Sequence, residues 1–245
     1  MQSMNPVMKD DVLLKERSFV SDSSSTMTLQ GAVNRSISAV AICVIAAFIS
    51  WQLSYNAAWM GPLMGVGVFG GLIVALVTIF KKSWAPITTP IYALFEGAAL
   101  GAISNVFQAQ YSGIVFQAVG LTFGVLFLML TIYRARLIRV TQRFRIAMTA
   151  AIGAIFLVYI VGFILSFFGM SIPLIHESGP IGIIFSLVVV GVASFSLLLN
   201  FDSIEKGASA NLPKYMEWYC AFGLLVTLIW LYLEILNLLS KLQRR

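Results

Sequence analysis

Seven apolar segments, each long enough to cross a lipid bilayer, constrain this chain more than any other feature of its sequence. A transmembrane helix needs about 20 apolar residues, because the hydrocarbon core is ~30 Å thick and a helix rises ~1.5 Å per residue. The chain is 59% hydrophobic and only 11% charged, with a mean hydropathy of +0.91. We therefore predict an all-α, polytopic membrane protein. Its expected spans are 33–54, 61–80, 85–107, 112–133, 146–170, 180–201 and 218–240.

The residues before the first span are polar. Residues 1–32 mix acidic and basic side chains and include a run of hydroxyl residues at 23–26. Such a composition buries too little apolar surface to fold alone, so we expect a flexible cytoplasmic tail at 1–32 and a seven-helix membrane domain at 33–245. No apolar core of a cleavable signal peptide is visible before residue 30, so the first span is expected to direct its own insertion.

The distribution of basic residues predicts the orientation. Of the 16 Lys and Arg residues, three follow the last span and the other thirteen lie in the tail or in alternate connections. The intervening connections 55–60, 108–111 and 171–179 contain neither residue type. By the positive-inside rule the N-terminus is cytoplasmic. The thirteen are Lys9, Lys15, Arg17, Arg35, Lys81, Lys82, Arg134, Arg136, Arg139, Arg143, Arg145, Lys206 and Lys214.

The three remaining basic residues, Lys241, Arg244 and Arg245, follow the seventh span. Seven full crossings from a cytoplasmic N-terminus would place these residues outside, where basic residues are disfavoured. Either their side chains snorkel to the interface, or the seventh segment does not cross completely.

Three acidic residues lie inside or at the end of apolar segments. Glu96 and Glu234 are near mid-depth, and an acid there costs at least ~2.5 kcal/mol to insert. We predict that both face the interior of the bundle and have a function; the competing interpretation is a protonated acid hydrogen-bonded in the core. Asp202 follows Asn200 at the cytoplasmic end of the sixth span, where composition alone favours an ordinary solvated acid. Asn237, one turn after Glu234, lies on the same helical face.

Carboxyl groups in such a position suit ion passage. An acid removed from water favours its neutral form, and two acids in contact can share one proton. In the ionised form they attract a hard cation such as Ca²⁺, which prefers ~6 to 8 oxygen ligands. Two or three carboxylates with Asn200, Asn237, hydroxyls and water predict a weak Ca²⁺ transit site near Asp202 and Glu234. We expect no tight metal site and no cofactor.

Other classes of function lack sequence support. The chain contains no His-Glu-x-x-His, Gly-x-Ser-x-Gly or P-loop motif, so we do not expect an enzyme. Its single histidine, His176, lies in an outer connection. The basic residues are explained by membrane orientation, so no nucleic-acid partner is expected. Cys43 and Cys220 lie in or beside apolar segments and predict neither a disulfide framework nor a zinc site.

Three stretches resemble the Bax-inhibitor-1 family, also called the transmembrane Bax inhibitor motif proteins, and most closely its bacterial branch. They are YALFEGAALG at 92–101, NFDSIE at 200–205 and, most specifically, LYLEILNLL at 231–239. The resemblance extends over all seven spans. It implies a bundle in which six helices surround a central seventh, and a pH-sensitive Ca²⁺ leak channel. It also implies a multi-pass protein of the bacterial inner (plasma) membrane; eukaryotic relatives suppress cell death.

The resemblance also implies roles for single residues. An aspartate pair between the sixth and seventh helices senses pH in the family, and it corresponds to Asp202 and Glu234 here. The second acid is one methylene longer than in the family, and a contact between the two acids is implied by the resemblance alone. Glu96 stands where many relatives have a small or hydroxyl residue. With Tyr232 and Asn237, it is a further candidate for a polar ion pathway.

Two functions are therefore expected from the sequence. The first is a channel for Ca²⁺ or protons, gated by protonation of a carboxylate pair. The alternative is a regulatory protein that conducts nothing and binds another membrane component, such as a quality-control protease. Acids at mid-depth favour the channel, because a protein that only binds a partner does not need them. In either case the lipid bilayer is a partner.

Overall fold

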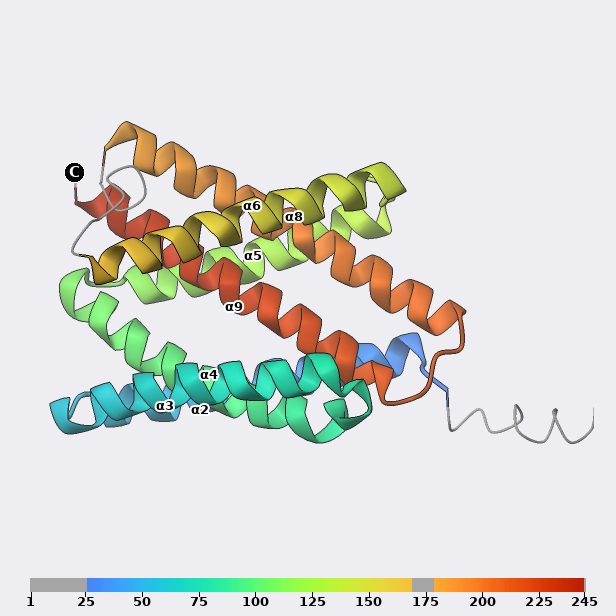
Figure 1. Cartoon of the computed structure of the whole chain (residues 1–245), viewed down its shortest axis with the longest axis horizontal. Coiled ribbons are helices and arrows are strands. Elements are labelled where there is room, and N and C mark those ends of the chain that lie inside the picture. The colour runs from blue at the N-terminus through green and yellow to red at the C-terminus, as the bar shows by residue number, and fades with distance from the viewer. Residues whose placement is uncertain (1–25, 169–178, 245) are drawn as a thin grey trace, which may run out of the picture.

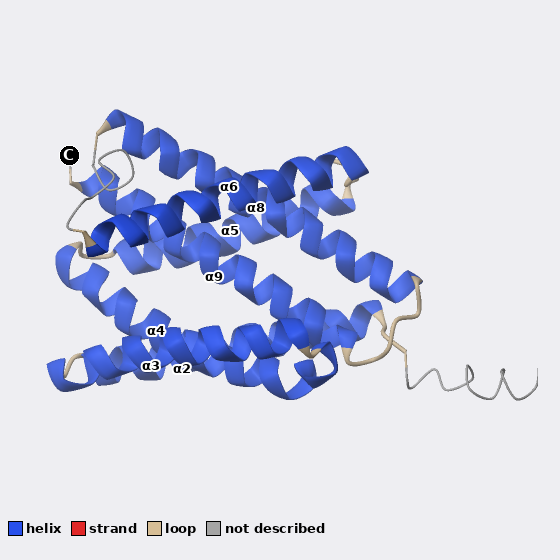
Figure 2. Cartoon of the chain, in the orientation of Figure 1, coloured by secondary structure: helices blue, strands red, loops and turns tan. Residues whose placement is uncertain are grey.

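The computed structural model describes residues 26–168 and 179–244, which form seven long helices joined by short connections (Figures 1 and 2). Each helix is long and apolar enough to cross a membrane, which confirms the seven predicted spans. The first 25 residues of the predicted tail, His176 and Arg245 lie outside the described residues. The helices are α2 (Leu29–Ser54), α3 (Ala57–Phe80), α4 (Ala85–Gln110), α5 (Ile114–Arg134), α6 (Gln142–Phe167), α8 (Pro180–Ser209) and α9 (Met216–Gln243).

Most helices extend beyond the predicted spans, and the start of α2 and the end of α8 are two of these differences. The predicted tail is too long, because α2 begins at Leu29 and Thr28 caps it by accepting a hydrogen bond from the Gly31 amide. Met27 is also buried, and its amide donates to the Leu212 carbonyl at 2.7 Å. Helix α8 continues eight residues past the expected end at 201. Hydropathy falls there, but the backbone hydrogen bonds of a helix do not depend on apolar side chains.

Helix α9 is the centre of the bundle. It runs diagonally between one group formed by α2, α3 and α4 and another formed by α5, α6 and α8 (Figure 1). In its most apolar stretch 67% of the residues are buried, compared with 6% in α6, which is the most peripheral helix. The predicted arrangement, in which six helices lie around a central seventh, is therefore confirmed.

The connections define two ends of the bundle. The basic end contains the connections at 81–84, 135–141 and 210–215, and the opposite end contains those at 55–56 and 111–113. The last residues of α9 reach the opposite end, where the Arg244 Nε donates to the Tyr111 hydroxyl at 2.7 Å. The seventh segment is therefore one continuous helix that extends from the basic end of the bundle to the opposite end.

Glycine allows α2 and α4 to approach closely. A Cβ atom added at Gly101 would lie 2.2 Å from the Ala47 carbonyl oxygen, and one at Gly97 would lie 2.5 Å from that of Cys43. Real Cβ atoms do not come so near to a backbone oxygen. The small-residue spacing of α4 therefore serves helix packing, as membrane helices use it elsewhere.

Candidate functional site

Glu234 lies in the interior of the bundle, on the central helix. Only 6% of the surface of this residue is exposed. The Tyr159 hydroxyl of α6 donates to Oε1 at 2.7 Å, and the Trp230 indole N–H donates to the same oxygen at 3.2 Å. Lys241, two turns later, interacts with it electrostatically. The second oxygen, Oε2, is buried and has no hydrogen-bond partner among the described residues.

Asp202 is the centre of an ion-pair cluster at the basic end. Arg145 of α6 donates to its Oδ2, and Lys206, one turn later in α8, reaches the same oxygen at 2.9 Å. The Asp202 side chain is 11% exposed, whereas that of Arg145 is 37% exposed. Glu205, one turn after Asp202 in α8, accepts a hydrogen bond from the Tyr133 hydroxyl of α5. Asp202 is thus a buried anion with two cationic partners, and it joins α6 to α8.

Asp202 and Glu234 do not form the contact that the family resemblance implies. The Asn200 amide of α8 donates to the Thr227 hydroxyl of α9 at 2.7 Å, which fixes the register of these antiparallel helices. From that level, Asp202 lies two residues towards the basic end and Glu234 lies seven residues towards the opposite end. Nine residues of helix separate the two acids by about 13 Å along the bundle axis. A shared proton needs the two acids in contact, and this arrangement of α8 and α9 gives them different partners.

Glu96 lies in a third place. It is half-buried on α4 and faces Gly71 of α3, where an added Cβ would be 2.6 Å from its Oε1. Tyr92 and Cys43 are the neighbouring titratable groups. Glu96 therefore belongs to the group formed by α2, α3 and α4, and it joins neither of the other two acids.

The remaining polar candidates make local contacts. Asn200 binds Thr227, as described above, and Thr227 in turn donates to the Gly223 carbonyl at 3.0 Å. The Tyr232 hydroxyl lies 2.7 Å from the Ser104 hydroxyl and links α9 to α4. Asn237 lines a cavity at the opposite end of the bundle.

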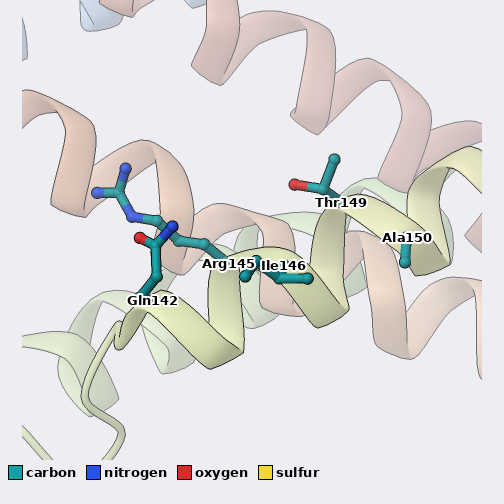
Figure 3. Close-up of a pocket in the computed structure, with 5 residues that line it drawn as sticks. All are labelled: Gln142, Arg145, Ile146, Thr149 and Ala150. Carbon is teal, nitrogen blue, oxygen red and sulfur yellow. The ribbon is translucent and has the colours of Figure 1, made fainter.

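Helix α6 is held to the rest of the bundle by few contacts. Only Met148 and Ile155 are buried along its length. Besides the bonds of Arg145 and Tyr159, two ring contacts attach it to α8, Phe144 with Phe195 and Tyr159 with Phe185, both at 6.4 Å between centroids. An open groove on this helix is lined by Gln142, Arg145, Ile146, Thr149 and Ala150 (Figure 3).

Three residues of these clusters were not predicted as site residues. Arg145 was counted among the basic residues of a connection, and its place in the first turn of α6 brings it to Asp202. Tyr159 stands within an apolar run and gave no signal. Lys241 was assigned to a tail that could snorkel, but it is 3% exposed. A partner for each acid could have been expected from the cost of burying charge, but its identity could not.

This arrangement can hold and release a proton, and it can attract a cation for a short time. Glu234 provides one oxygen with two donors and one oxygen that has no donor among the described residues. Among residues 26–168 and 179–244, no three His, Cys, Asp or Glu side chains come together as a metal site. Tight coordination of Ca²⁺ needs several oxygen ligands, and Glu234 contributes one carboxyl group here.

Comparison with known proteins gives a consistent result. A family model described as Bax inhibitor 1 like matches residues 5–244, which is nearly the whole chain. A search of the curated proteins finds no match.

Proposed function

The chain belongs to the Bax inhibitor 1 like family, and from that premise we propose that it is a pH-sensitive calcium leak channel gated by protonation of buried carboxyl groups. One observation supports this most directly. A carboxyl group is enclosed in the central helix with an oxygen, Oε2 of Glu234, that has no hydrogen-bond partner in the described part of the chain. A group that only stabilised the fold would be expected to satisfy both oxygens.

In this proposal the closed state has a proton on Glu234. The neutral acid fits a site removed from water, with Tyr159 and Trp230 donating to Oε1. As pH rises the proton leaves, and the resulting anion is costly to bury without a cation or water. The ionised site therefore draws in water and Ca²⁺. Leak is expected to increase with pH, and Lys241 is the other charged group that acts on this carboxylate.

Helix α6 is the element we propose to move. It is the least buried helix, and two of its contacts involve acids: Arg145 with Asp202 and Tyr159 with Glu234. When Glu234 ionises and recruits water, the Tyr159 contact changes while the ion pair at the basic end remains. Asp202 then acts as an anchor for α6, and Glu234 acts as the sensor.

The proposed setting is the bacterial inner membrane with a cytoplasmic N-terminus. Thirteen of the 16 basic residues of the chain then fall on the cytoplasmic side, as the positive-inside rule requires. The basic end of the bundle would be cytoplasmic, so Ca²⁺ passing between the ends would cross the membrane. The proposed partners are lipid and Ca²⁺ or protons.

Ion flux from liposomes containing the purified protein tests the proposal. Ca²⁺ efflux is measured across a series of pH values for the wild type and for Glu234→Gln. The amide keeps the shape of the side chain but cannot titrate, so the pH dependence of efflux should disappear. Glu205→Gln, an exposed acid of α8, is the matched control and should keep it.

Two results would contradict the proposal. Absence of Ca²⁺ efflux from wild-type liposomes at every pH would favour the non-conducting alternative, a regulatory protein that binds another membrane component. An unchanged pH response in Glu234→Gln would remove Glu234 as the sensor. If Glu96→Gln abolished the response instead, the sensor would lie in α4.

A further inference from the structure

The opposite end of the bundle contains a polar cavity of about 320 Å³ between α4 and α9. Its α9 lining follows helical spacing, so these residues share one face of the helix. That face continues to Glu234, which lies three residues before Asn237. The described residues that line the cavity include two cations and no acid: Val106, Phe107, Gln110, Asn237, Ser240, Lys241 and Arg244.

Lys241 lines this cavity and follows Glu234 by two turns of α9. It is 3% exposed, and its ammonium group donates to the Gly182 carbonyl at 3.2 Å and to the Ser186 hydroxyl at 2.8 Å, both in α8. Ser186 lies fourteen residues before Asn200 and Lys241 lies fourteen residues after Thr227, so the ammonium group is held near the level of its own residue, two turns or about 10 Å from Glu234 along α9. The electrostatic interaction between the two groups agrees with this placement.

We propose that Lys241 is a fixed positive charge that limits the passage of divalent cations between the cavity and Glu234. This inference rests on the proposed channel function and names a residue that sets its rate and selectivity. In this proposal, a cation that moves between the cavity and the carboxylate comes near an ammonium group that two oxygens of α8 hold in the cavity lining. Repulsion is proportional to the charge of the ion, so it slows Ca²⁺ more than Na⁺. Arg244 adds a second positive charge in the same cavity.

Lys241 also has a simpler structural role, and the two roles can be separated. A cation near the end of α9 interacts favourably with the helix dipole, and its bonds to Gly182 and Ser186 join α9 to α8. A substitution that removes only these contacts would lower the stability of the protein without changing its preference between Ca²⁺ and Na⁺. Removing the repulsion would change the ratio of Ca²⁺ to Na⁺ flux. The ratio is therefore the decisive measurement.

The test compares Ca²⁺ and Na⁺ efflux from liposomes at one pH where the wild type conducts. Lys241→Met removes the charge and shortens the side chain by one atom, and it should raise the Ca²⁺ to Na⁺ flux ratio on the order of tenfold. Lys241→Arg keeps the charge and should leave the ratio near that of the wild type. Ser186→Ala removes one anchoring hydroxyl but no charge, so it should also leave the ratio unchanged.

A second variant covers the case in which Lys241→Met does not fold. Arg244 is exposed, and Arg244→Glu reverses a charge in the same cavity, so it should raise the ratio as well. If the wild type conducts and the flux ratio is unchanged in Lys241→Met, the role of Lys241 is overturned and the channel function stands. If Lys241→Met does not fold, an unchanged ratio in Arg244→Glu has the same consequence. A wild type that does not conduct would overturn both.

Discussion

The Tyr159 hydroxyl lies 2.7 Å from Oε1 of Glu234 and donates a hydrogen bond to it, which joins the most peripheral helix, α6, to the central helix, α9. Tyr159 is half-buried, and its ring also contacts Phe185 of α8. The Tyr159 side chain therefore contacts two other helices, α8 through Phe185 and α9 through Glu234, the proposed sensor. Changes at this residue are expected to alter the response of the protein without removing the acid itself.

Tyr159→Phe should move the pH response of Ca²⁺ efflux to higher pH. The hydroxyl donates to an oxygen that becomes negative when the proton leaves, so its loss disfavours the ionised form of Glu234. The closed, protonated state would then persist over a wider range of pH. The ring and its contact with Phe185 remain. A midpoint that stays in place, or moves to lower pH, would argue against stabilisation of the anion by Tyr159.

Asp202→Asn and Arg145→Gln should show coupling with each other. The ion pair is half-exposed on the Arg145 side, so the interaction free energy from a double-mutant cycle of unfolding in detergent is expected to be about 1 kcal/mol. Either variant should also raise leak at all pH values, because α6 loses an anchor, while its pH dependence remains. Lys206→Gln is the comparison, since this lysine is 59% exposed and should have a smaller effect. Loss of the pH dependence in Asp202→Asn would mean that Asp202, and not Glu234, is the pH sensor.

Gly101→Ala should lower the stability of the protein. Its methyl group would meet the Ala47 carbonyl oxygen at 2.2 Å and force α2 away from α4, at a cost of roughly 1–3 kcal/mol. Gly124→Ala is a matched control in α5, where an added Cβ has no neighbour within 4 Å. There the gain in helix propensity, up to about 1 kcal/mol, should leave stability equal or higher. Thermal unfolding of both variants in the same detergent gives the comparison.

Cysteine labelling in intact bacterial cells should give the orientation. In a background without Cys43 and Cys220, Ser112→Cys should react with a membrane-impermeant maleimide, because it lies at the opposite end of the bundle. Leu137→Cys, in the arginine-rich connection, is 74% exposed and should react only after the cells are made permeable. The reverse pattern of labelling would place the basic end outside the cytoplasm.

The existence of seven spans was predictable from the sequence because it depends on local properties. A run of about 20 apolar residues must cross the bilayer as a helix, since every backbone polar group has to be satisfied within the segment. The glycines of α4 could be read in the same way, because small residues at helical spacing permit close packing. The end of α8 was placed too early, since hydropathy marks where a helix leaves the membrane and not where it stops.

The partners of the buried acids could be decided only by the tertiary structure. The sequence predicts that Glu234 must avoid lipid, because burying an acid is costly, but many side chains could offset that cost. Which one does so depends on the relative register of helices that are far apart in the chain. That register gives Glu234 the Tyr159 hydroxyl, gives Asp202 the Arg145 guanidinium, and separates the two acids by about 13 Å of helix. Composition determines which residues cross the membrane, whereas the packing of the helices determines which residues meet.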